Sequence, residues 1–107
     1  ELEECRIDWF QPAETVHNLV RGTNPAPGAW TLIRQDGTEK RLKVLRTSIE
    51  PNQQGTPGTI LSYGSAGLII ACGTHAVRLL EVKPEGKRAM TAEEMMRGVH
   101  ATSFSIV

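Results

Sequence analysis

Positively charged side chains gather in two stretches of the chain, and such cations are the groups that proteins use to hold phosphate. Residues 21–46 carry six Lys and Arg against two acids, and residues 78–88 carry four against two. Each neutralised phosphate of a nucleic acid releases a condensed counterion, so four or five contacts give salt-sensitive, sequence-independent affinity. The candidate phosphate-binding residues are Lys40, Arg41, Lys43, Arg46, Lys83, Lys87 and Arg88. They predict a nucleic-acid-binding surface if the two stretches are neighbours, and an ordinary solvated charged face if they are not.

Other reactive side chains do not assemble into a site. The spacing Cys72-x-x-His75 could supply half of a zinc site, but structural zinc needs four ligands and the sequence has no second pair. His17 and Asn18 are adjacent, so on a helix they point about 100° apart and do not face one another. We therefore expect no metal, no cofactor site and no catalytic residue in this chain.

Composition narrows the class of protein. The 107 residues allow one compact core, and 12 Lys plus Arg balance 12 Asp plus Glu, so any basic surface must come from segregation of charge. The longest apolar run, 68–72, is far shorter than the roughly 20 residues that span a bilayer. Only two cysteines, Cys5 and Cys72, occur, which favours a reducing compartment. A folded, soluble, cytoplasmic domain is expected.

The first predicted element is a helix over residues 12–21. Pro12 suits a first helical turn, and Ala13, Val16 and Val20 form an apolar stripe. Gly22 is the predicted stop. The following segment, 23–28, contains two prolines and a glycine and reads as an extended connection.

Five short strands follow. They are expected at about residues 29–34, 40–49, 58–63, 68–72 and 76–83, and Asp36-Gly37 signals a hairpin between the first two. Because side chains alternate along a strand, Leu42 and Val44 share one face while Arg41 and Lys43 share the other.

A second helix is expected after the strands. Thr91-Ala92-Glu93-Glu94 matches a capping box, which places Met95 and Met96 on the inner side of a helix that ends near Gly98. The tail, 101–107, is apolar enough to lie against the body. The predicted fold is mainly β: a small five-stranded antiparallel barrel, similar to oligonucleotide-binding barrels, with an N-terminal and a C-terminal helix.

Several motifs follow one another in order along nearly the whole chain. They are Ile7-Asp8-Trp9, Pro12-Ala13-Glu14, His17-Asn18-Leu19-Val20-Arg21-Gly22, Asn24-Pro25, Pro27-Gly28-Ala29-Trp30, Gly55-Thr56-Pro57-Gly58-Thr59-Ile60 and Pro84-Glu85-Gly86-Lys87-Arg88-Ala89-Met90-Thr91-Ala92-Glu93. Together they resemble the C-terminal domain of methionyl-tRNA formyltransferase, in the formyltransferase C-terminal domain family.

The resemblance implies an enzyme that formylates methionine on initiator tRNA in translation initiation. Its co-substrate, 10-formyltetrahydrofolate, is bound by an N-terminal catalytic domain, which would be absent from this chain. Residues 1–6 would be a remnant of the interdomain linker, and residues 7–107 the barrel that holds the tRNA without catalysing the reaction alone. The expected partners are initiator methionyl-tRNA and the chain's own catalytic domain, with no membrane and no metal.

Three positions depart from the family pattern, and one alternative stays open. Ala26 stands where an aromatic is usual, Phe10 where a small polar residue is usual, and Lys83 where Gln is usual. The alternative is a structural C-terminal domain of a related formyltransferase or formyltetrahydrofolate dehydrogenase, with no nucleic-acid role. Basic stretches on opposite sides of the molecule would favour that alternative.

Overall fold

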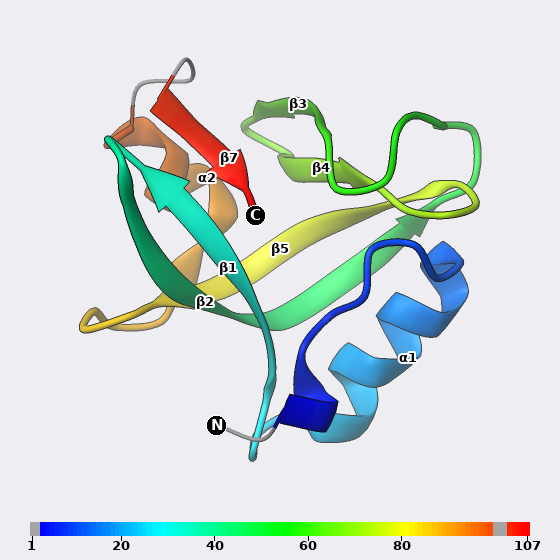
Figure 1. Cartoon of the computed structure of the whole chain (residues 1–107), viewed down its shortest axis with the longest axis horizontal. Helices are drawn as coiled ribbons and strands as arrows, with labels where there is room; N and C mark the ends of the chain where they lie inside the picture. The colour runs from blue at the N-terminus through cyan, green and yellow to red at the C-terminus, as the bar shows by residue number, and fades with distance from the viewer. Residues whose placement is uncertain (1–2, 100–102) are drawn as a thin grey trace.

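The computed structural model describes residues 3–99 and 103–107 as a curved antiparallel sheet with two α-helices packed against it (Figure 1). In chain order the elements are η1 (Glu3–Cys5), α1 (Ala13–Thr23), β1 (Ala29–Gln35), β2 (Thr38–Glu50), β3 (Ile60–Gly64), β4 (Gly67–Ala71), β5 (Ala76–Pro84), β6 (Met90–Thr91), α2 (Ala92–Arg97) and β7 (Phe104–Ile106). None of the described helices has the length and hydropathy needed to cross a bilayer.

The sheet is a nearly closed barrel with the order β3-β4-β5-β2-β1-β7, and β6 pairs with β5. A mainly β, barrel-like fold with two helices is therefore confirmed, but the predicted count of five strands is wrong. The five predicted strands correspond to β1–β5. The two additional strands have only two and three residues, too few for alternation to be read from the sequence.

The hairpin of β1 and β2 follows directly from its turn. Asp36 and Gly37 have φ of 52° and 81°, the left-handed conformation that a two-residue turn needs. Gln35 therefore faces Thr38, and counting back along both strands places Trp30 opposite Lys43. Leu42 and Val44 are fully buried, as the alternation predicts.

Helix α1 ends later than the sequence indicates. Gly22 lies inside the helix, and the helix ends at Thr23 because Pro25 excludes the helical conformation at Asn24, whose ψ is 135°. The buried stripe is the predicted one, Ala13, Val16 and Val20.

Helix α2 begins at the predicted cap. Thr91 Oγ1 accepts a hydrogen bond from the Glu94 backbone N–H at 3.0 Å. Met95 and Met96 are buried on its inner side, and Gly98 is the C-cap. In a full capping box the glutamate carboxylate accepts a hydrogen bond from the backbone N–H of the N-cap residue. Here the Glu94 carboxylate instead binds Arg88.

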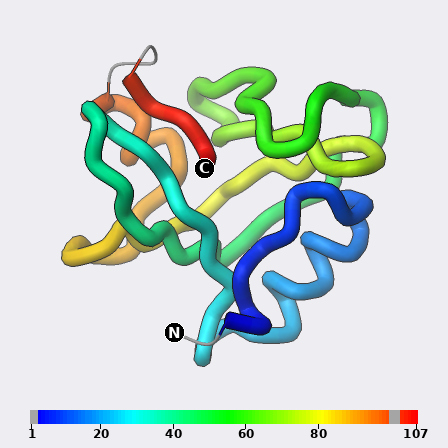
Figure 2. The backbone as a smooth tube through the Cα atoms, viewed as in Figure 1, coloured from blue at the N-terminus to red at the C-terminus, as the bar shows by residue number. Residues whose placement is uncertain are grey.

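The N-terminal segment packs on the barrel. Figure 2 shows it running beside the start of β1, where Arg6 forms a parallel bridge with Trp30. Cys5 is buried, and the Ile7 N–H donates to the Trp30 carbonyl at 2.8 Å. The Trp9 indole N–H donates to the Thr31 hydroxyl at 3.0 Å, so two buried polar groups satisfy each other.

Candidate nucleic-acid interface

The two basic stretches meet on one surface of the barrel. Strands β2 and β5 are neighbours, and Lys43 lies directly opposite Lys83 in their register. Arg41 is two residues from Lys43 along β2 and shares its face. These three cations, which we call the basic cluster (Arg41, Lys43 and Lys83), line a cavity of about 210 Å³.

A buried aromatic ring holds Arg41. The guanidinium carbon lies 4.1 Å from the centre of the Trp30 ring, well inside the range of a cation–π contact. Arg6 approaches the same ring at 5.4 Å, and Trp30 is only 2% exposed although it is on the outer face of β1. The Trp30 ring therefore holds the guanidinium of the half-buried Arg41 in place, which reduces the entropy lost when this group binds a ligand.

The turn after β5 is hydrogen-bonded to Arg41. The Arg41 N–H donates to Glu85 Oε1 at 2.9 Å, and the Glu85 N–H donates to the Arg41 carbonyl at 3.0 Å. Gly86, with φ of 77°, and the bond from the Lys87 N–H to the Pro84 carbonyl at 3.0 Å complete the turn. Although Glu85 is acidic, its carboxylate accepts a backbone N–H and ties the second basic stretch to the first.

Lys43 and Lys83 are two like charges directly opposite each other. Like charges directly opposite each other destabilise a sheet. The stem of Lys43 packs against Gly28, where a Cβ would lie 3.6 Å from Lys43 Cδ, and the side chain is half-buried. Lys83 is exposed, and no ion pair of Lys83 occurs within the described residues.

The remaining predicted residues are distributed around this cluster rather than within it. Lys40 and Lys87 line a neighbouring cavity of about 250 Å³ beside α2. Arg46 lies beyond a β-bulge in β2 and pairs with Glu81 at 3.9 Å. Arg88 forms an ion pair with Glu94, and this hydrogen bond holds the pKa of the Glu94 carboxyl below its ordinary value.

Cys72, His17 and His75 take structural positions. Cys72 is fully buried, and burial raises the pKa of its thiol to about 11. The Cys72 N–H donates to the His75 carbonyl in a tight turn, and His17 Nδ1 lies 2.8 Å from the Thr47 hydroxyl. Within residues 3–99 and 103–107, no three His, Cys, Asp or Glu side chains gather as metal ligands would.

Two residues that position Arg41, Trp30 and Glu85, were not predicted from the sequence. The signal for Trp30 was present, since the two-residue turn at Asp36-Gly37 fixes its register opposite Lys43. Nothing local in the sequence indicates that the Glu85 carboxylate reaches the backbone of β2.

The sequence matches the family described as formyl transferase, C-terminal domain, over residues 1–100. The chain belongs to this formyl transferase C-terminal domain family. Among curated proteins, a methionyl-tRNA formyltransferase of Protochlamydia amoebophila (strain UWE25) is 48% identical over 99 residues, which are 92% of this chain and 31% of that protein. One of Chelativorans sp. (strain BNC1) is 43% identical over 96 residues, 90% of this chain and 30% of its own length. The formyl transferase C-terminal domain thus spans about a third of these relatives.

The fold of the formyl transferase C-terminal domain also occurs in a solved structure. HypX from Aquifex aeolicus, crystallised in complex with tetrahydrofolic acid, superposes with a TM-score of 0.72 at 21% identity, over 92% of this chain and 18% of HypX. At this identity the likeness establishes a shared fold alone.

Proposed function

We propose that this chain is the tRNA-docking domain of a methionyl-tRNA formyltransferase. The whole enzyme would formylate methionine on initiator tRNA with 10-formyltetrahydrofolate, bound by a catalytic domain that precedes this one. The family membership and the curated relatives support the assignment. The observation that carries the docking role is the basic cluster, in which Arg41 is fixed on Trp30 beside the facing pair Lys43 and Lys83.

In this proposal the cluster binds backbone phosphate and leaves the bases unread. A guanidinium can bind phosphate through two parallel hydrogen bonds, and a lysine acts as a point charge. Phosphate contacts set the register and orientation of a nucleic acid, as is needed to present an acceptor stem to a distant active site. Lys40 and Lys87, one cavity away, would extend the contact along the backbone, whereas Arg46 and Arg88 would first have to leave a carboxylate.

The test is initiator tRNA binding measured against salt concentration. Each lost phosphate contact lowers the slope of log affinity against log salt by about 0.9. A variant with Arg41→Gln, Lys43→Gln and Lys83→Gln is therefore expected to lose up to about three contacts and most of its affinity. The control is Arg21→Gln, which removes an exposed cation on α1 by the same kind of substitution. We expect it to change the affinity and the salt slope little.

An unchanged slope in the triple variant would refute the docking role. The domain would then be a structural part of a related formyltransferase or formyltetrahydrofolate dehydrogenase. Basic stretches on opposite sides of the molecule would favour that alternative. The pairing of β2 with β5 instead brings the two stretches together.

A further inference from the structure

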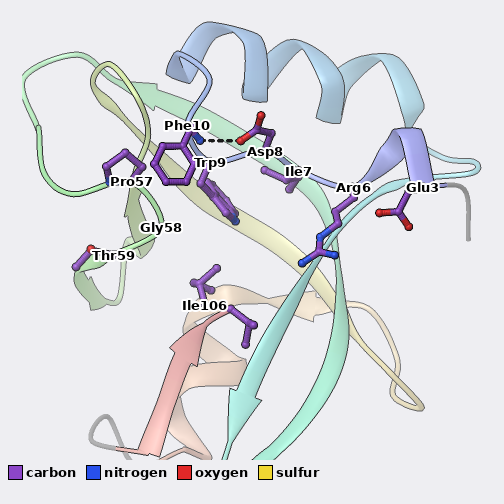
Figure 3. Close-up of a pocket in the computed structure, with 11 residues that line it drawn as sticks. Glu3, Arg6, Ile7, Asp8, Trp9, Phe10, Pro57, Gly58, Thr59 and Ile106 are labelled. Atoms are coloured by element: carbon purple, nitrogen blue, oxygen red, sulfur yellow. Dashed lines mark hydrogen bonds between the residues drawn. The ribbon is translucent and has the colours of Figure 1, made fainter.

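A groove runs along the side of the barrel where the sheet does not close. One cavity, of about 610 Å³, lies between the N-terminal segment, residues 57–59 and the end of the chain (Figure 3). A second, of about 500 Å³, lies between the end strands β3 and β7. Both are lined by Gly58, Thr59 and Ile106, so they are continuous. We call the two together the seam groove; the basic cluster does not line it.

The large apolar side chains that the described part of the chain exposes line this groove. Phe10, Tyr63 and Val107 are the large hydrophobic residues that the described part of the chain exposes, at 76%, 49% and 41%. Phe10 and Val107 line the first cavity and Tyr63 the second. Exposed apolar side chains that gather around a hollow mark an interaction surface, whereas scattered ones do not.

Phe10 is presented on a fixed backbone. Its N–H donates to Asp8 Oδ1 at 3.0 Å, and Figure 3 shows its ring beside Pro57 at the rim of the groove. On the other side Gly73 packs so closely that a Cβ there would lie 2.0 Å from the Phe10 carbonyl oxygen. Because this backbone is already ordered, little conformational entropy is lost when a partner covers the Phe10 ring.

The charge of the lining favours a protein over a nucleic acid. The charged residues of the seam groove are Glu3 and Asp8 against Arg6, a net negative set that repels a polyanion. Apolar rings bordered by a few charges are typical of a protein–protein contact.

The position of the groove indicates which protein docks there. Glu3 lines the rim, so the N-terminal end of the described chain lies beside the groove. In the curated relatives the matched region is about 31% of the protein, and the family is a C-terminal domain, so most of such a protein precedes it. A domain tethered at this rim has an effective concentration in the millimolar range, and a modest apolar contact then keeps it docked.

We propose that the seam groove is the docking surface for the catalytic domain of the same polypeptide, with Phe10 and Tyr63 as its apolar anchors. This rests on the proposed function only for the existence of that domain. It requires no contact with tRNA, and tRNA binding by the basic cluster requires no contact at the groove.

The test uses the full-length protein without RNA. A cysteine is placed in the groove by Thr59→Cys, and a matched control is placed outside it by Asn52→Cys, both at exposed positions. Reaction with a maleimide is followed by mass spectrometry of the labelled peptide. We expect the groove cysteine to react roughly tenfold more slowly, as a docked population of about 90% would give. Adding Phe10→Ser and Tyr63→Ser is expected to remove most of that difference.

Several results would overturn the proposal. The two cysteines could react equally fast in the otherwise unaltered protein, a comparison that does not depend on the anchor variants. Protection that grows with protein concentration would assign the groove to a second copy of the chain, and protection that appears only with added tRNA would assign it to nucleic acid. Because the assay contains no RNA otherwise, loss of tRNA affinity in the triple glutamine variant leaves its outcome unchanged.

Discussion

Replacing Arg41 by lysine separates the charge of the basic cluster from its geometry. The substitution keeps the positive charge but removes the planar group that lies 4.1 Å from the centre of the Trp30 ring. A cation–π contact contributes about 0.5–1 kcal/mol at exposed sites and about 2 kcal/mol when desolvated. Here Trp30 is 2% exposed and Arg41 is half-buried, and lysine retains part of the attraction. The expected loss is about 0.5–1 kcal/mol of folding stability.

Two assays measure this loss. Thermal unfolding followed by circular dichroism is expected to shift down by roughly 2–6 °C, since 1 kcal/mol corresponds to several degrees in a domain of this size. Binding of tRNA is expected to weaken about two- to fivefold at every salt concentration if the guanidinium must be held in place to meet phosphate. The slope against salt stays unchanged, because the number of phosphate contacts is the same.

Arg41→Gln is the matched comparison. It removes the charge and is expected to lower the salt slope by about 0.9 as well as the affinity. If Arg41→Lys has the unfolding temperature and tRNA affinity of the unaltered chain, the Trp30 platform does not position the guanidinium, and the reasoning fails.

Three further predictions concern groups outside the cluster. Thr31→Val keeps the shape of the side chain but leaves the buried Trp9 indole N–H without an acceptor, so urea unfolding is expected to show a loss of about 1–3 kcal/mol; equal stability would contradict the role of that bond. Because Arg88 lowers the pKa of Glu94, the stabilisation from this pair is present above the ordinary value of 4.5 and is lost as pH falls through the lower folded value. The stability difference between the unaltered chain and Glu94→Gln should thus be constant near neutral pH and shrink in acid; a difference that grows in acid would reverse the sign. With the pKa raised to about 11, the Cys72 thiol is expected to resist iodoacetamide at about pH 8 in the folded chain and to react in denaturant, as mass spectrometry would show; rapid labelling of folded protein would contradict its burial.

Local signals in the sequence were sufficient for most of the fold. The turn at Asp36-Gly37, the apolar stripe of α1 and the cap at Thr91 each depend on a few neighbouring residues, and each is found where it was predicted. Strand β7 was missed because its pairing with β1 depends on partners far away in the sequence and involves only three residues. The end of α1 was misplaced because Pro25, rather than Gly22, terminates the helix.

The candidate site was predictable in kind but not in arrangement. Residue types alone singled out seven candidate cations, of which three form the basic cluster. The hairpin register was enough to place Arg41, Lys43 and Trp30 together. That Lys83 faces Lys43 could not be read from the sequence. The pairing of β5 with β2 is non-local, and the bulge in β2 shifts the register along it. The same bulge lies between Lys43 and Arg46.

The facing of Lys43 and Lys83 across two strands exists only once β5 has paired with β2. An unfolded chain carries the same charges but no paired ammonium groups. Any polyanion that exploits the pair is thus linked thermodynamically to the native state and raises the unfolding temperature as its concentration rises.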